Sequence, residues 1–218
     1  MNTQTRKLEQ GAVNINTRIA AVYKYVALSI LMAAFGSYMG MQYLQLLQGM
    51  SYWGFVIAEF AFLIGLIIYK EKEPLNLFLL FGFTFLSGFV IAPLLAFTLA
   101  TDPNILVNAL LSTSVAVGAI SLYAMNTKRD FSGMGKYLFV ALIVIVVASI
   151  ANIFIQSSGF HLMLSIGSGI LFSFYLIYDT QNVVNNNFDH PMTAAVGIYL
   201  DILNIFLSIL NILSASRD

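Results

Sequence analysis

Two aspartates near the end of the chain are the residues whose type and place most directly predict chemistry. Asp179 follows Tyr178 at the end of one apolar run, and Asp201 lies inside the next run, in Tyr199-Leu200-Asp201. A charge at the centre of a bilayer costs roughly 2.5 to 3.5 kcal/mol on insertion scales. Because acids are costly there, their presence predicts a functional site.

The spacing of the pair predicts that the two acids act together. Asp179 and Asp201 each lie eleven residues from His190, in the turn between the runs. A helix rises about 1.5 Å per residue, so both acids reach a similar depth and can approach each other. Two close carboxylates titrate as a unit, which predicts a proton sensor, and their oxygens are ligands that Ca²⁺ accepts and protons displace. In a second interpretation they cap helix ends or reach water, which suits Asp179 better than Asp201.

The face of the last run that carries Asp201 is too polar for lipid. At about 100° per residue, the same face presents Asn204, Ser208 and Asn211. Such a face predicts part of an ion pathway, or hydrogen bonds that pack one helix against another. Close helix approach is expected at Gly167 and Gly169 of the preceding run. The polar face of that run contains Ser165, Ser168, Tyr175 and Asp179.

Glu59 is a third acid at membrane depth, in an apolar run that ends at Lys70. Its position predicts that Glu59 lines an ion path, or that it is a protonated acid bonded to a neighbouring helix. Lys70 falls at the membrane face where the aspartate pair is expected. We therefore predict that Lys70 is a latch that pairs with a deprotonated carboxylate. In the alternative, its side chain only reaches the membrane interface.

Composition sets the fold class. Apolar residues make up 59% of the 218 and charged residues 9%, which excludes a soluble domain of this size. Apolar runs of about 20 residues predict bilayer-crossing helices, because every backbone group in lipid must be paired. We expect an all-α, polytopic seven-helix bundle, with a cytoplasmic N-terminal arm (1–18) and one transmembrane domain (19–218). The spans are expected at 20–46, 52–69, 75–99, 104–125, 136–156, 161–183 and 192–213.

The basic residues predict the orientation. Nine of the ten lysines and arginines fall on one side of the seven spans. The positive-inside rule then places the N-terminus in the cytoplasm and Arg217-Asp218 outside. A re-entrant last segment, with six full spans, stays an alternative to a crossing helix at 192–213.

Other chemistries find little support in the residues. The chain has no cysteine, which excludes thiol catalysis and thiolate metal sites. His161 and His190 fall near opposite span ends, so one metal site cannot use both. The residues around the two aspartates do not match the motifs of an intramembrane aspartyl protease. The chain is therefore expected not to be an enzyme. Asn152 is interpreted as a packing residue, and Lys128-Arg129 as contacts to lipid head groups rather than to nucleic acid.

The hairpin that carries both aspartates resembles a known signature. Its segments Tyr175-Leu176-Ile177-Tyr178-Asp179-Thr180-Gln181 and Ile198-Tyr199-Leu200-Asp201-Ile202-Leu203-Asn204-Ile205-Phe206 are similar to that of the transmembrane Bax inhibitor motif family, also called the Bax inhibitor-1 family. The resemblance extends over nearly the whole chain after about residue 20. It includes Gly88 with Pro93, the loop 128–132, and Asn152-Ile153-Phe154.

The resemblance implies both a fold and a function. The fold has seven helices, with the last one central and two three-helix layers around it. Prokaryotic members imply a pH-sensitive calcium leak, in which Asp179 and Asp201 are the sensor, Lys70 is the latch to Asp179 and Glu59 lines the path. Ca²⁺ and protons are then the ligands, in contact with membrane lipids and without a covalent cofactor.

The ending of the chain implies a location and a competing function. It stops at Ser214-Ala215-Ser216-Arg217-Asp218 without the basic tail of eukaryotic relatives, which implies a multi-pass protein of the bacterial inner membrane. The same ending resembles a bacterial subgroup that modulates a membrane-anchored AAA protease. The alternative expectation is therefore a non-conducting interaction protein that binds such a protease.

Overall fold

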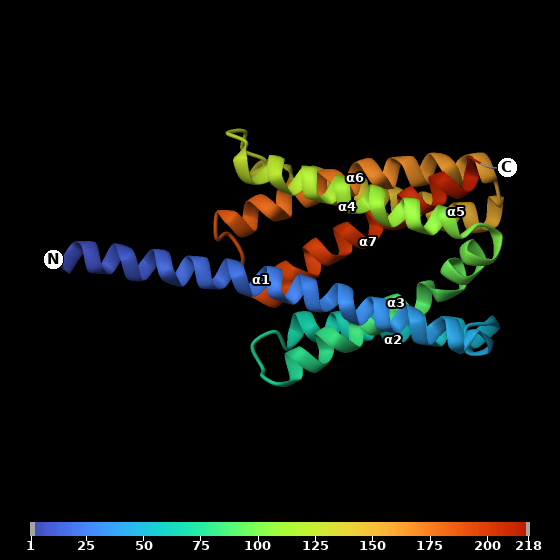
Figure 1. Cartoon of the computed structure of the whole chain (residues 1–218), viewed down its shortest axis with the longest axis horizontal. Coiled ribbons are helices and arrows are strands. Elements are labelled where there is room, and N and C mark those ends of the chain that lie inside the picture. Colours follow the sequence, from blue (N-terminus) through green and yellow to red (C-terminus); the bar gives the residue numbers. More distant parts are fainter. Residues whose placement is uncertain (1–2, 217–218) are drawn as a thin grey trace. The chain divides into compact units, whose positions relative to one another are not determined.

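The computed structural model describes residues 3–216, with side chains from residue 16 onward. Seven helices in this part are long and apolar enough to cross a membrane, which confirms the expected fold class (Figure 1). Two short 3-10 turns also occur, η1 (Leu44–Leu46) and η2 (Ser132–Met134). The helices are α1 (Thr3–Gln42), α2 (Gly49–Ile68), α3 (Leu75–Thr101), α4 (Pro103–Asn126), α5 (Gly135–Ile155), α6 (Ser158–Val184) and α7 (Pro191–Ala215).

The first helix differs most from its expected bounds. α1 begins at Thr3, and its portion Asn16–Gln42 has the apolar character of a span. Residues 3–18 are therefore helical, and their expected role as a cytoplasmic arm stays a prediction. At the other end, η1 replaces the last helical turn that was expected to reach residue 46. Residues 1–2, the side chains of residues 3–15 and Arg217-Asp218 lie outside the described part of the chain.

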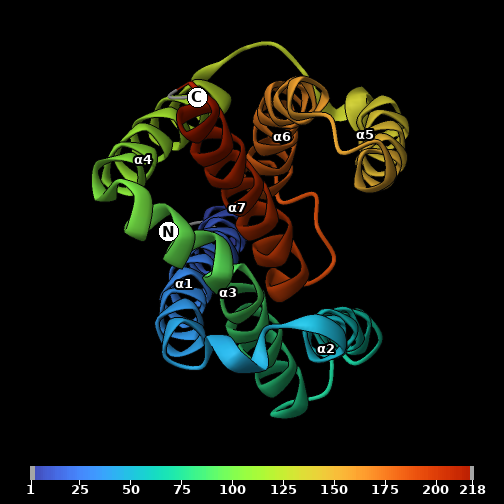
Figure 2. The same cartoon turned by 90° about the vertical axis from the view of Figure 1, so that its right-hand side faces the viewer.

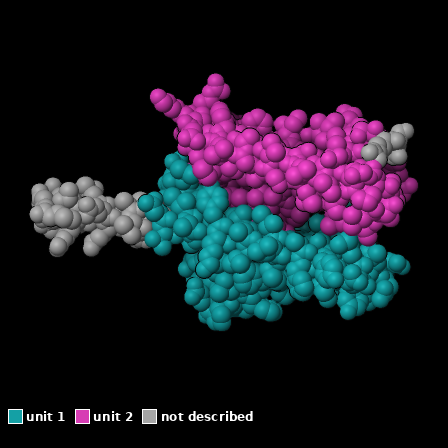
Figure 3. All heavy atoms as spheres, viewed as in Figure 1, with its two compact units in different colours: residues 1–94, 183–197 teal, residues 95–182, 198–218 magenta. Residues whose placement is uncertain are grey.

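The chain divides into two compact units, drawn in different colours in Figure 3. Unit 1 comprises residues 1–94 and 183–197, and unit 2 comprises residues 95–182 and 198–218. α3 and α7 are the most buried spans, with 44% of the most apolar window buried in each, whereas the value is 6% for α2 and α5. α2 and α5 thus expose apolar side chains suited to lipid. The central position implied for the last helix stays an expectation.

Within unit 1, α3 lies between α1 and α2 (Figure 2). A Cβ atom added at Gly36 of α1 would collide with the Phe85 backbone, and one added at Gly88 of α3 would collide with the Ala33 backbone. The two helix backbones therefore touch at this crossing, as small residues permit in membrane helices. Gly40, four residues after Gly36, extends the contact along α1.

Within unit 2, α6 packs against both α5 and α7 (Figure 2). A Cβ atom at Gly169 would lie 3.3 Å from the Ser208 Cβ of α7, and one at Gly167 would lie 3.3 Å from Ile145 Cδ1 of α5. Both distances are shorter than ordinary van der Waals contact. The close helix approach expected at these two glycines is confirmed, and it brings the polar face of α6 to that of α7.

Candidate functional site

Asp201 is a buried acid in the middle of α7. Its side chain is only 3% exposed, and its Oδ2 atom has no hydrogen-bond partner among residues 16–216. A buried carboxylate oxygen without a partner is costly in a folded protein. The position is therefore poorly explained by packing alone.

Asp179 lies on α6 in the same unit and is half-buried. Its carboxyl group accepts a hydrogen bond from the side chain of Asn182. It is close enough to Asp201 for the two charges to interact, and Tyr175 on α6 lies within electrostatic range of both. The structure thus brings the two aspartates into one neighbourhood, with a phenol hydroxyl beside them.

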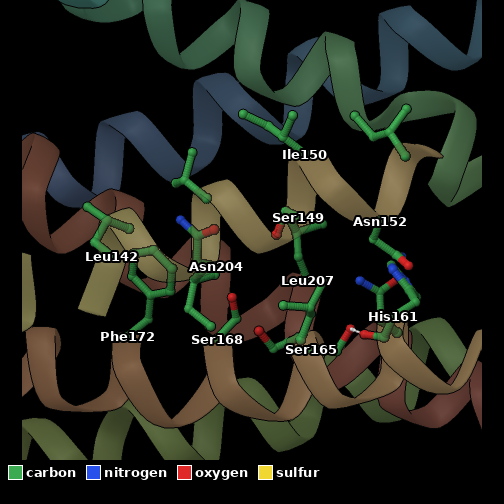
Figure 4. Close-up of a pocket in the computed structure, with 16 residues that line it drawn as sticks. Leu142, Ser149, Ile150, Asn152, His161, Ser165, Ser168, Phe172, Asn204 and Leu207 are labelled. Carbon is green, nitrogen blue, oxygen red and sulfur yellow. Dashed lines mark hydrogen bonds between the residues drawn. The ribbon is translucent and has the colours of Figure 1, made fainter. Parts of the chain in front are cut away.

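A cavity of about 560 Å³ lies in unit 2 between α5, α6 and α7 (Figure 4). Asn204, Ser208 and Asn211 of α7 line it, so three of the four residues on the predicted polar face of that helix share one cavity. Asn204 is three residues after Asp201, or about 4.5 Å along the helix axis. The other polar lining residues are Ser149 and Asn152 of α5 with His161, Ser165 and Ser168 of α6.

The polar groups in this cavity are neutral amides and hydroxyls, apart from one imidazole. Asn204 donates its amide N–H to the Leu200 carbonyl at 2.8 Å, which leaves its side-chain oxygen to accept other donors or a cation. The α5 wall is mostly apolar, with Leu142, Ile145 and Val146. Neutral oxygens of this kind can replace part of the hydration shell of a cation without holding it tightly.

Sequence reasoning did not assign Ser149, Asn152 or His161 to a functional site, and the last two are the most informative. Figure 4 shows their side chains near each other at one end of the cavity. The Asn152 Oδ1 atom is buried and has no hydrogen-bond partner in the described part of the chain. His161 lies four residues before Ser165 and seven before Ser168, so helical phase alone places it on their face. For Asn152, the only sequence feature that could have indicated a place in the cavity is a polar side chain in the middle of an apolar span.

Glu59 lies on α2 in unit 1, half-buried and within electrostatic range of Tyr52, which precedes it by two turns of the helix. It does not line the cavity of unit 2. Its expected place along an ion path stays a prediction. The same holds for the alternative, an interior acid bonded to a neighbouring helix.

Lys70 follows the end of α2, and its Nζ atom lies 3.0 Å from Asp189 Oδ2, in the turn between α6 and α7. Sequence reasoning did not single out Asp189. The Lys70 side chain is 29% exposed and that of Asp189 is 84% exposed. Lys70 belongs to unit 1 and Asp179 to unit 2. The expected pairing between Lys70 and Asp179 stays a prediction.

A resident metal site would need more ligands than the aspartate pair. Among the described residues, no group of three or more histidine, aspartate or glutamate side chains is gathered in one place. Ca²⁺ takes six to eight oxygen ligands in proteins. Asp179 and Asp201 could therefore meet a passing ion together with backbone and water oxygens, but they do not form a complete cage by themselves.

The loop between α4 and α5 is fastened to α6 beside Asp179. Gln181 is buried, donates its amide N–H to the Arg129 carbonyl at 2.8 Å and accepts the Phe131 N–H at 3.0 Å. A Cβ atom added at Gly135, at the start of α5, would lie 2.7 Å from the Tyr178 hydroxyl. The segment from Arg129 to Gly135 thus rests on the end of α6 that carries the first aspartate.

Replacement of Gln181 by leucine is expected to release this loop. The Phe131 N–H and the Arg129 carbonyl lose a part-buried hydrogen bond each, and a typical intramolecular hydrogen bond contributes about 0.5 to 1.5 kcal/mol. Amide hydrogen exchange in residues 127–134 should accelerate by about tenfold or more. Gln45→Leu, at an exposed position in unit 1, is the matched control. Equal exchange in the two variants would contradict the anchoring role of Gln181.

The comparisons with known proteins agree with this architecture. A family model described as "Inhibitor of apoptosis-promoting Bax1" (Bax1-I) matches residues 15–218. An uncharacterised protein of Helicobacter pylori strain 26695 is 44% identical over 201 residues, which cover 92% of this chain and 87% of that protein.

Two further relatives come from other sources. An uncharacterised membrane protein of Vibrio cholerae is 34% identical, with 71% of this chain and 72% of that protein covered. The Golgi anti-apoptotic protein of Vaccinia virus strain Lister is 33% identical, with 70% and 64% covered. With seven apolar helices and a family match over nearly its whole length, this chain is a multi-pass membrane protein of the Bax inhibitor-1 family.

Proposed function

We propose that this protein is a passive cation leak, with Ca²⁺ as its main ion, and that protonation of Asp179 and Asp201 opens it. The observation that carries the proposal is the buried carboxylate of Asp201, with an oxygen that lacks a partner and with a second acid in electrostatic range. The next turns of the same helix line a polar cavity. Acids at membrane depth characteristically mark ion and proton pathways.

In this proposal Lys70 closes the leak by pairing with deprotonated Asp179. The pairing of Lys70 with Asp189 does not prevent this exchange. Because the Asp189 side chain is 84% exposed, its ion pair is screened by water and contributes little, so Lys70 leaves it at small cost. Protonation of the aspartate pair removes the charge that attracts Lys70, and the leak opens as pH falls.

We place the protein in the bacterial inner membrane with its N-terminus in the cytoplasm. The support is the distribution of lysine and arginine, which follows the positive-inside rule. Asp179 and the α6–α7 turn then lie near the cytoplasmic face, and the cavity with His161 lies in the outer half of the membrane.

The purified protein in liposomes that contain a calcium indicator tests the proposal. We expect Ca²⁺ uptake above that of protein-free liposomes, and we expect it to rise as pH is lowered from mildly alkaline to mildly acidic. Replacement of Ca²⁺ by a bulky organic cation, such as choline, is the control for non-selective leakage. Folded protein that gives no uptake at any pH would contradict the proposal, and copurification of a membrane AAA protease with such protein would favour the non-conducting alternative.

A further inference from the structure

The turn between α6 and α7 is held by two cations from distant parts of the chain. The Arg18 guanidinium donates hydrogen bonds to the backbone carbonyls of Phe188 at 3.1 Å and Asp189 at 3.3 Å. It also lies 4.7 Å from the centroid of the Phe188 ring. Lys70 supplies the second cation through its ion pair with the Asp189 carboxylate. All four residues belong to unit 1.

Arg18 makes more contacts with the turn than Lys70 does, and its hydrogen bond to the Phe188 carbonyl is part-buried, whereas that to the Asp189 carbonyl is exposed. The Lys70 pair depends on a carboxylate that is 84% exposed, and exposed pairs contribute little. Arg18 instead makes three contacts through one planar guanidinium group. Two of its partners are backbone carbonyls, so they are present whatever the protonation state of the acids.

The turn itself is short and locally ordered. Only residues 185–190 separate the end of α6 from the start of α7. Asn186 takes a left-handed φ of 54°, which asparagine tolerates, and donates its N–H to the Val183 carbonyl at 3.0 Å. His190 accepts the Met192 N–H at 3.2 Å and the Thr193 hydroxyl donates to the His190 carbonyl at 2.9 Å. A restraint on this turn is therefore passed directly to the ends of both helices.

We propose that Arg18 is a positioning residue that fixes the α6–α7 turn to α1 and so restrains the ends of α6 and α7 at that turn, in the two helices whose later and earlier turns carry Asp179 and Asp201. This inference rests on the proposed function, in which those two acids form the gate. The charged and titratable groups at the turn are Arg18, Lys70, Asp189 and His190. Because Arg18 contacts two backbone carbonyls and a phenyl ring, its hold on the turn does not depend on the protonation state of the acids.

Amide hydrogen exchange of the full-length protein tests the attachment without any measurement of transport. In Arg18→Gln, exchange in residues 185–190 should be about tenfold faster, because hydrogen bonds to a charged group are lost. Arg18→Lys keeps the charge but not the planar fork, so an intermediate rate is expected. Lys24→Gln, an exposed lysine on the same helix, is the matched control. Exchange in Arg18→Gln that equals the control would overturn the inference.

Ca²⁺ uptake in liposomes tests the effect on the gate. Arg18→Gln should raise the leak several-fold at mildly alkaline pH, where the gate is closed, and leave it unchanged at acidic pH, where the gate is already open. Arg18→Lys should restore part of the closed state. If the unsubstituted protein takes up Ca²⁺ and the Arg18→Gln and Lys24→Gln variants share one pH profile, the inference is overturned. No uptake by the unsubstituted protein would instead show that the proposed function fails.

Discussion

Replacement of Asp179 by asparagine is expected to make Ca²⁺ uptake nearly independent of pH, and replacement of Asp201 by asparagine is expected to alter the pH dependence. Asp201→Asn leaves Asp179 able to pair with Lys70, so this variant should still close at alkaline pH, but with a shifted pH profile. Asparagine resembles a protonated aspartate in shape and lacks its negative charge, so Asp179→Asn mimics the open state. At mildly alkaline pH the leak of Asp179→Asn should rise about tenfold above that of the unsubstituted protein, a factor that corresponds to roughly 1.4 kcal/mol of lost closed-state interaction. At acidic pH the variants and the unsubstituted protein should conduct alike.

Two companion variants make this test specific. Asp201→Glu keeps a titratable carboxylate and should retain a pH-dependent leak. Asp130→Asn is the matched control, because Asp130 is exposed in the α4–α5 loop. The Ser132 backbone N–H donates to Asp130 at 2.8 Å, which lowers the pKa of that carboxyl group and keeps it charged throughout the test range. An unchanged pH profile in both Asp179→Asn and Asp201→Asn would sink the gate assignment.

Gly88→Ala is expected to destabilise the protein strongly, although it adds only one methyl group. Alanine in place of glycine within a helix normally stabilises by about 1 kcal/mol. At Gly88 the added Cβ atom would collide with the Ala33 carbonyl group, which belongs to the backbone of α1 and cannot rotate away. The overpacking cost of about 1 to 3 kcal/mol therefore reverses the sign.

Thermal unfolding in detergent measures this effect. Gly118→Ala is the matched control, because a Cβ atom at Gly118 of α4 meets nothing within 4 Å. We expect the unfolding midpoint of Gly88→Ala to fall and that of Gly118→Ala to stay level or rise slightly. Midpoints that move together would show that α1 and α3 do not touch at Gly88. Gly36→Ala, where the obstacle is the Phe85 backbone, should behave as Gly88→Ala does.

The sequence alone was sufficient to identify the spans. A helix in lipid needs a continuous apolar run of a minimum length, so hydropathy reports its position directly. The expected and observed ends agree within a few residues for α2 to α7. The arm was the exception, because its polar composition gave no sign that the helix of α1 already begins at Thr3. Helical phase also found Asn204, Ser208 and Asn211, which share one cavity.

Neighbours from different helices were decided only by the tertiary structure. Helical phase shows which side chains share a face, but the rotation and tilt of each helix determine which other face it meets. From sequence, Asn152 is therefore interpreted as a packing residue, whereas in the structure its side chain lies near that of His161 (Figure 4). Gln181 likewise gave no signal that it holds a loop fifty residues earlier in the chain.

The partners of the two cations show the same limit. The sequence predicts that Lys70 follows the end of an apolar span, which the structure confirms, because that position is a local property. It did not reveal that Asp189 is the acid beside Lys70, or that Arg18 holds the same turn from 170 residues away. Depth in the membrane follows from the order of apolar residues along the chain, whereas contacts between spans depend on packing that no single span contains.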